Sequence, residues 1–178
     1  MPTGDPFDPK KLLPPSLREF IAITEVDRAD AFIGDLFQRK FGHPLPEFPH
    51  HVVAFYRKSW DCLIPFSYVH VLPFGDIYLI GGASTDGRAF DAMEPGQREE
   101  IRAQGGIYLH ALRYAFAKFG GDCDAFFGYC GDSRAYEVDV AAGFEPTEHE
   151  KLIAVWHKPL DPVRRRCLVA MAHAIGAF

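Results

Sequence analysis

The chain has 178 residues, 48% of them apolar and 16 of them phenylalanine, so it can bury a sizeable core and is not expected to be disordered. Its formal charge of −5 disfavours general attraction to nucleic acid, which needs a basic surface or stripe. The sequence has no apolar run approaching the roughly 20 residues that a membrane helix needs. Its N-terminal residues also lack the apolar central segment of a signal peptide. We therefore expect one domain over residues 1–178, in a cytoplasmic protein that binds neither nucleic acid nor a membrane.

The N-terminal quarter is expected to be helical after an arm. Residues 1–15 are rich in proline, which predicts an extended arm. Ser16 is a candidate N-cap, and apolar residues then recur at helical spacing as far as residue 41. This pattern predicts one or two amphipathic helices, ended by Gly42 and the prolines that follow it.

The next segment is typical of an antiparallel meander. Residues 51–58 are β-branched and aromatic, residues 64–72 alternate, and residues 77–82 follow a turn at 73–76. The alternation places Phe66, Tyr68 and His70 on one face of the second strand. Residues 84–97 are polar and turn-rich, which predicts a loop.

The C-terminal half alternates between helices and strands. An amphipathic helix ends at Gly120-Gly121, and it is followed by a strand at 124–130, a helix at 133–142 and a strand at 150–158. Pro162 opens a further helix over residues 162–178. The predicted fold class is α/β, with a mixed, mostly antiparallel sheet flanked by helices and an extra helix at the C-terminus.

One spacing carries a resemblance. Asp132, Ala135, Asp139, Gly143 and Phe144 fall on the register Asn-x-x-Ala-x-x-x-Tyr-x-x-x-Gly-Phe, in which Asp139 stands at the tyrosine position. With the order of elements, this resembles the GNAT acyltransferases. The resemblance implies their fold and a coenzyme A-dependent N-acyl transfer, in which that tyrosine protonates the departing thiolate in many members.

The resemblance also implies a pyrophosphate site where the long helix begins. The family motif there is Arg/Gln-x-x-Gly-x-Gly/Ala, and the first turn of a helix offers free N–H groups to an anion. The chain supplies Arg102, Ala103, Gln104, Gly105, Gly106 and Ile107, of which Ile107 departs from the motif. Alternatively, residues 97–104 are themselves helical and the two glycines are only a kink.

The proton-transfer groups are harder to assign. An aspartate with an ordinary pKa is ionised at neutral pH, so Asp139 would repel a thiolate. Tyr136, one turn earlier, could compensate or could simply be a core or surface residue. His70 and Tyr68 are the candidates to assist the amine, because imidazole titrates near neutrality. The other interpretation, a hydrogen-bonded structural histidine in a strand, is the more usual one for His70.

The resemblance therefore implies an N-acyltransferase that uses acetyl-CoA or another acyl-CoA as cosubstrate and a small or peptidic amine as acceptor. It also implies that pantetheine lies between the strands at 77–83 and 124–130. The alternative is a catalytically silent GNAT-fold module, favoured if Gly105 lies inside a continuous helix. The four cysteines and eight histidines lack ligand spacing, so no metal is expected. The apolar C-terminal helix makes a homodimer possible, and residues 84–100 could cover the acceptor pocket or contact a partner.

Overall fold

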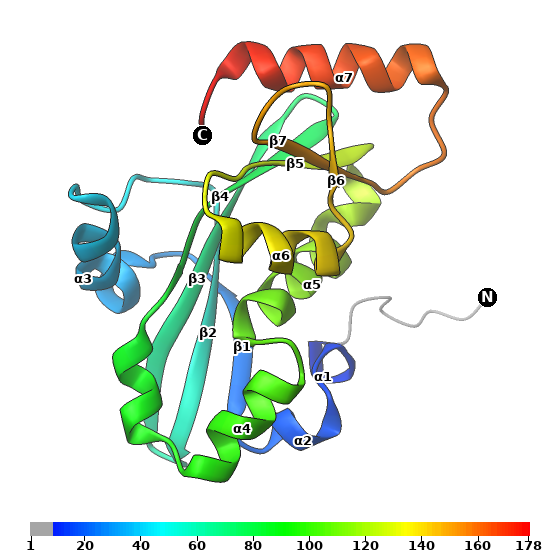
Figure 1. Ribbon diagram of the computed structural model, residues 1–178. Helices are drawn as coiled ribbons and strands as arrows, with labels where there is room; N and C mark the ends of the chain where they lie inside the picture. Colours follow the sequence, from blue (N-terminus) through cyan, green and yellow to red (C-terminus); the bar gives the residue numbers. More distant parts are fainter. Residues whose placement is uncertain (1–8) are drawn as a thin grey trace.

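A single sheet of seven strands forms the centre of the computed structural model, which describes residues 9–178 (Figure 1). The spatial order of the strands is β1-β2-β3-β4-β5-β7-β6. The strands are β1 (Ile21–Val26), β2 (His50–Ser59), β3 (Cys62–Phe74), β4 (Ile77–Thr85), β5 (Ala125–Tyr129), β6 (Glu145–Pro146) and β7 (Leu152–Trp156). All neighbours pair antiparallel except β4 and β5, which are parallel. The predicted mixed, mostly antiparallel α/β class is therefore confirmed.

Helices cover both faces of the sheet. They are α1 (Pro9–Leu12), α2 (Pro15–Arg18), α3 (Asp30–Phe41), α4 (Pro95–Ala103), α5 (Ile107–Phe119), α6 (Ser133–Ala142) and α7 (Pro162–Ile175), with short 3-10 turns at η1 (Gly87–Ala92) and η2 (Gly120–Asp122). Because β4 and β5 are parallel, the chain must cross over between them, and α5 is part of that crossover. The predicted C-terminal helix is present as α7, which lies across one end of the molecule (Figure 1).

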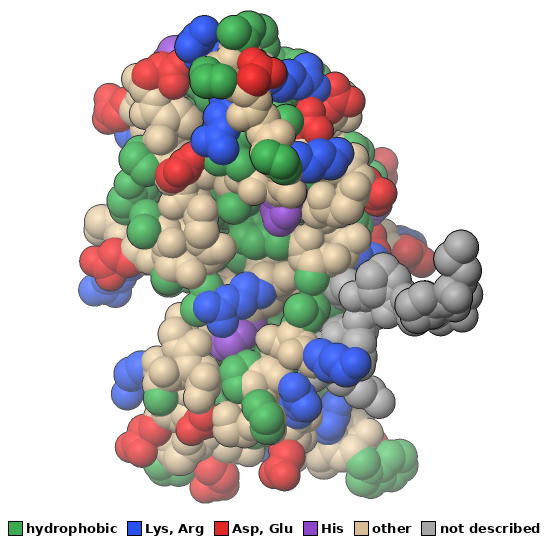
Figure 2. Space-filling model, turned by 90° about the vertical axis from the view of Figure 1, so that its right-hand side faces the viewer, with side chains coloured by type: hydrophobic (Ala, Val, Ile, Leu, Met, Phe, Trp, Pro, Cys, Tyr) green, Lys and Arg blue, Asp and Glu red, His purple; other side chains and the backbone are tan. Residues whose placement is uncertain are grey.

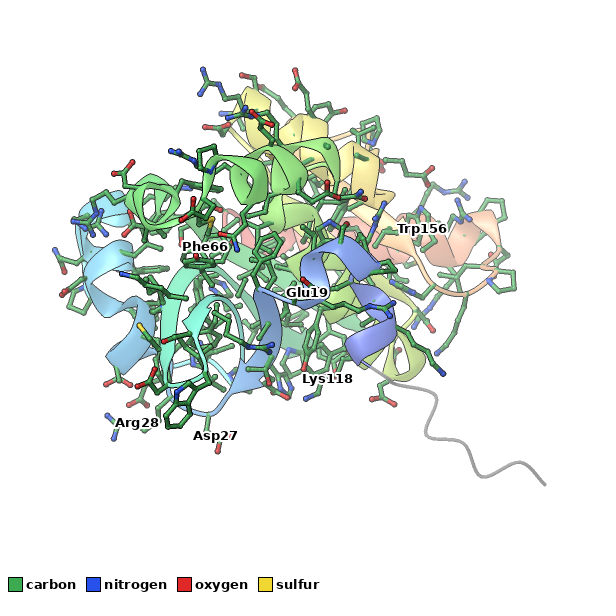
Figure 3. All side chains as sticks on the ribbon, turned by 90° about the horizontal axis from the view of Figure 1, so that it is seen from below. Glu19, Asp27, Arg28, Phe66, Lys118 and Trp156 are labelled. Carbon is green, nitrogen blue, oxygen red and sulfur yellow. The ribbon has the colours of Figure 1, made fainter. Side chains whose placement is uncertain are left out.

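Alternation along the strands divides the core between the two faces. On β2, Val52 and Ala54 belong to the large cluster that contains α5, whereas Val53 and Phe55 pack with α3. On β4, Leu79 joins a third cluster with the apolar side of α7. Figure 3 shows Phe66 inside the molecule, while Asp27 and Arg28 project into solvent at the turn between β1 and α3.

The N-terminal quarter differs from its prediction. Residues 21–26 form β1 instead of helix, paired with β2, because alternate side chains such as Ile21 and Ile23 are buried against the sheet. Ser16 is not an N-cap, since α2 begins at Pro15 with Pro14 before it. The Ser16 hydroxyl instead donates a hydrogen bond of 2.6 Å to Glu100 on α4. The predicted extended arm contains α1 from Pro9 onward, and its first eight residues lie outside the described part.

The segment predicted as a loop at 84–97 is mostly ordered into elements. It holds the end of β4, all of η1 and the first turn of α4. Asp86 caps η1 by accepting a hydrogen bond from the Arg88 N–H, and Gln97 closes a capping box with Glu94 at the start of α4. The prediction of a loop was wrong because several of the polar residues in this segment cap helices instead of lying in irregular structure.

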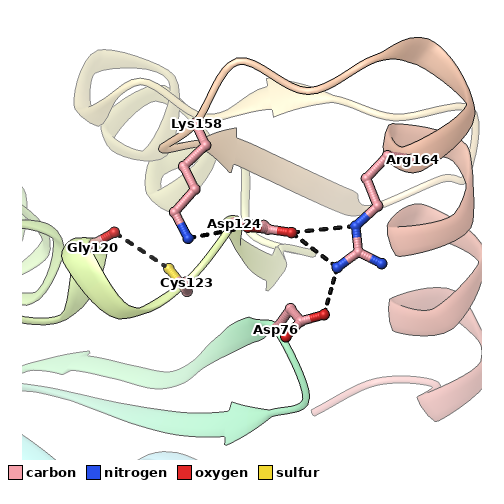
Figure 4. Close-up of polar contacts among 6 residues, drawn as sticks. All are labelled: Asp76, Gly120, Cys123, Asp124, Lys158 and Arg164. Atoms are coloured by element: carbon pink, nitrogen blue, oxygen red, sulfur yellow. Dashed lines mark hydrogen bonds and ion pairs between the residues drawn. The ribbon is translucent and has the colours of Figure 1, made fainter.

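An ion-pair cluster fixes α7 to the sheet. Arg164 donates to Asp124 at 2.9 and 3.2 Å and to Asp76 at 2.5 Å, and Lys158 reaches Asp124 at 3.2 Å (Figure 4). Asp76 and Asp124 directly precede β4 and β5, and the Asp124 N–H donates to the Asp76 carbonyl. Arg164 therefore ties together the first residues of the two parallel strands.

Acidic and basic side chains are interspersed over the face of the molecule shown in Figure 2, so this face is neither uniformly acidic nor uniformly basic. Among residues 9–178, no helix combines the length and the apolar composition needed to cross a membrane.

Candidate active site

Strands β4 and β5 separate partway along their length. Their parallel pairing runs from Ile77 opposite Ala125 to Ile80 opposite Gly128 and goes no further, although β4 continues to Thr85. At the same level the register between β3 and β4 shifts, and Gly82 has φ +63°. The shift marks a β-bulge, which turns backbone groups of β4 away from regular pairing. The result is a V-shaped opening in the sheet.

Glycines at the bulge make room for the ring of His70. A Cβ on Gly81 would lie 2.7 Å from His70 Nε2, and one on Gly82 would lie 2.6 Å from Nδ1. The opposite side of the imidazole stacks on Phe48, with ring centroids 3.6 Å apart. The His70 ring therefore occupies the space that side chains at positions 81 and 82 would need, and it packs directly against the bulge.

A cavity of about 220 Å³ occupies the opening. Its walls come from the diverging strands, from the loop after β5, and from side chains of α3, α5 and α6. The lining residues are Lys40, Phe41, Ile80, Gly81, Gly82, Ala83, Tyr108, Gly128, Tyr129, Cys130, Gly131, Asp132, Ala135, Asp139, Phe144, Ile153 and Phe178.

A buried carboxyl faces this cavity. Asp139 is 4% exposed, and its Oδ1 accepts a hydrogen bond of 2.8 Å from the hydroxyl of Tyr108 on α5. Burial raises the pKa of Asp139, and this effect is opposed by hydrogen bonds from Tyr108 and Cys130. Burial and the neighbouring carboxyl raise the pKa of Tyr108 as well. Asp139 therefore holds its proton to higher pH than the ordinary aspartate assumed from the sequence.

Two further polar side chains line the cavity. Burial raises the pKa of Cys130 to about 11, which keeps it a neutral thiol and a poor nucleophile. Lys40, in the last turn of α3, donates a hydrogen bond of 2.6 Å from Nζ to the Ala83 carbonyl, and burial lowers its pKa. Neither Lys40 nor Tyr108 was singled out from the sequence, since each is brought to the cavity only by tertiary packing.

The predicted pyrophosphate segment forms a break between two helices. α4 ends at Ala103, Gly105 and Gly106 both have φ +87°, and α5 begins at Ile107. No side chain caps the start of α5, and a Cβ on Gly106 would meet no atom within 4 Å. Gly105 therefore does not lie inside a continuous helix. The segment 102–107 does not itself line the cavity, but the first turn of α5 that follows it places Tyr108 in the lining.

The predicted amine-assisting residues lie beside the cavity but do not line it. Tyr68 is fully buried, and its hydroxyl is 2.7 Å from Nδ1 of His51. Burial, with a smaller contribution from the neighbouring His51, lowers the pKa of His70 to about 3. The imidazole is therefore neutral and a weak base. Tyr136 lies exposed on α6, outside the cavity lining.

A metal centre is not formed by the described residues. Across residues 9–178, no three His, Cys, Asp or Glu side chains gather in a way that could hold an ion.

No family model matches the sequence, and neither does any curated protein. Among solved structures, a putative acetyltransferase from Pyrococcus horikoshii is similar, with a TM-score of 0.50 and 13% identity over 72% of this chain and 44% of its own. This chain thus spans less than half of that protein. The ribosomal-protein-S18-alanine N-acetyltransferase from Escherichia coli gives a TM-score of 0.49 at 8% identity, covering 80% and 97%. At sequence identities this low, structural similarity shows the fold and nothing finer. The chain has the fold of the GNAT acyltransferases.

Proposed function

We propose that the chain is a coenzyme A-dependent N-acyltransferase, with acetyl-CoA or another acyl-CoA as donor and a small or peptidic amine as acceptor. The observation that carries this proposal is the opening between β4 and β5, with its bulge and cavity. A parallel pair that diverges exposes backbone donors and acceptors along both inner edges. Such edges suit an extended arm that carries amide groups.

The cofactor would lie along two neighbouring features. Its pyrophosphate would accept hydrogen bonds from the first turn of α5, where the open space beside Gly106 lets an anion approach the free N–H groups. Residues 102–107 would form that end of the site. The pantetheine arm would follow the opening between residues 81–83 and 128–131 toward Asp139. An oxyanion at the thioester carbonyl would be met by backbone N–H groups of the bulge.

The leaving thiolate would be protonated by Asp139. The acceptor amine attacks the thioester carbonyl, the C–N bond forms and the C–S bond breaks. The proton of the Asp139 carboxyl passes to the departing sulfur, and the proton that the amine loses passes to solvent. The Tyr108 hydroxyl then stabilises the new carboxylate at 2.8 Å. His70 and Tyr68 stay predicted helpers, and their packing supports a role in holding the bulge.

The alternative is a module with this fold that binds no acyl-CoA. From the sequence, Asp139, Ile107 and the long 84–100 segment favoured this alternative, and a continuous helix through Gly105 would have added to them. The chain instead breaks between α4 and α5 at Gly105-Gly106, which supports the proposed pyrophosphate site.

Calorimetric titration with acetyl-CoA, and separately with free coenzyme A, tests the proposal. We expect micromolar binding of both by the wild-type chain. Ala135→Trp places a large ring in the cavity lining and should abolish binding, whereas Ala141→Trp, at an exposed position of the same helix, should not. Absence of binding by the wild-type chain at millimolar ligand would favour the silent module.

A further inference from the structure

Lys40 holds an unusual position for a lysine. Its Nζ lies 2.6 Å from the carbonyl oxygen of Ala83, the residue that follows Gly82 in the β4 bulge, and its side chain lines the cavity. Lys40 is exposed at the surface, but its amine is held at a strand carbonyl beside the cavity.

The amine also lacks the usual anionic partner. Among residues 9–178, no carboxylate lies within ion-pair distance of Lys40. By contrast, Lys158 pairs with Asp124 and Lys118 with Glu25. Lys40 is exposed as a whole, but partial desolvation of its amine lowers the pKa, opposed by the charges of Asp132 and Cys130, and so favours the neutral form, in which nitrogen has a free electron pair. The neutral form is the nucleophilic one.

The position of Nζ relative to the bulge suggests what it can attack. If the bulge N–H groups receive the thioester oxygen, the carbonyl carbon lies within about one residue of Ala83, a separation of roughly 3–4 Å along a strand. The Lys40 Nζ is anchored at that residue. Holding a nucleophile and an electrophile together in this way raises the effective concentration greatly.

We propose that Lys40 is a self-acylation site, at which the chain transfers an acyl group from its own bound acyl-CoA to Nζ. This inference rests on the proposed function. Nζ attacks the thioester carbonyl, an amide forms and the C–S bond breaks. The departing sulfur takes the proton of Asp139, and the proton that Nζ loses passes to solvent. The acylated side chain stays in the cavity, so one acyl group is expected per chain.

Mass spectrometry of the full chain incubated with acetyl-CoA tests this. We expect one added acetyl group, located on Lys40 after digestion and formed at least about tenfold faster than on Lys58, an exposed lysine of β2. Excess free coenzyme A should slow the acetylation of Lys40, because it competes for the cofactor site, and should leave the rate of acetylation of Lys58 unchanged. Unfolding the chain in urea should remove the difference between the two lysines.

Two variants give matched controls. Lys40→Arg keeps a donor for the Ala83 carbonyl but cannot be acylated in this way, so the added acetyl group should disappear. Lys58→Arg should leave it in place. If coenzyme A binds but Lys40 reacts no faster than Lys58, the self-acylation proposal is overturned and the proposed function stands. If calorimetry detects no coenzyme A binding, both proposals are overturned.

Discussion

Replacing Asp139 by asparagine should stabilise the protein at neutral and alkaline pH and not at acid pH. The folded chain raises the pKa of this carboxyl, so it binds the proton more tightly than the unfolded chain does. That contribution is fully present below the unfolded pKa, near 4, and is lost as the pH rises through the folded pKa. Asparagine cannot ionise, and therefore Asp139→Asn keeps its stability where the wild type loses it.

The size of the effect follows from linkage. Between the unfolded and folded pKa values, the stability of the variant relative to wild type should grow by about 1.4 kcal/mol per pH unit and then level off. The 4% exposure of Asp139 leaves little solvent to screen this change. The hydrogen bond from Tyr108 can be kept by the asparagine oxygen, so any remaining packing cost should be the same at every pH.

Urea unfolding followed by tryptophan fluorescence, at a series of pH values from 4 to 8, measures the difference. Asp132→Asn is the control with the opposite sign. Asp132 caps α6 through two backbone N–H groups, which lower its pKa, so the stability it contributes is lost as the pH falls. A stability difference for Asp139→Asn that shrinks or reverses with rising pH would refute a raised pKa of Asp139 in the folded chain.

Three further outcomes are expected. Tyr108→Phe removes the hydrogen bond that would stabilise the Asp139 carboxylate as it forms, worth about 1.5–3 kcal/mol for a charged acceptor. It should lower kcat by roughly ten- to hundredfold with little change in coenzyme A affinity, as steady-state kinetics and calorimetry would show. An unchanged kcat would contradict the role of Tyr108. Gly82→Ala adds a Cβ 2.6 Å from His70 Nδ1 at φ +63°, so it should lower the urea midpoint and weaken coenzyme A binding together, whereas Gly87→Ala, in open space, should do neither. Arg164→Ala should lower the thermal midpoint, and high salt should reduce its difference from wild type, because the lost contacts are ion pairs.

The sequence was sufficient for most of the fold because most elements carry strong local patterns. The exception was β1, where Ile21 and Ile23 fit a short helical stripe as well as a strand, and a window of six residues is too short to separate the two periods. Its identity is decided by pairing with β2, which is a tertiary contact. Polar caps likewise hid η1 and the first turn of α4 within a segment that was predicted to be a loop.

The site was less predictable, because its chemistry depends on residues from separate helices. Asp139 was noticed from its spacing, but its pKa is set by burial and by Tyr108, a residue that looked like part of an apolar stripe. Lys40 belongs to α3, and only the packing of that helix beside β4 brings it to the bulge. Local patterns report a residue's neighbours along the chain and not the partners that determine its reactivity.

The cluster around Arg164 determines how the opening between β4 and β5 can move. Asp76 and Asp124 stand at the start of the two strands, and Arg164 binds both, so the paired end acts as a fixed pivot (Figure 4). Strands held together at one end can be spread only by bending, so the opening widens away from the Arg164 cluster. A ligand that enters at the wide end therefore meets an opening that is already present in the folded chain.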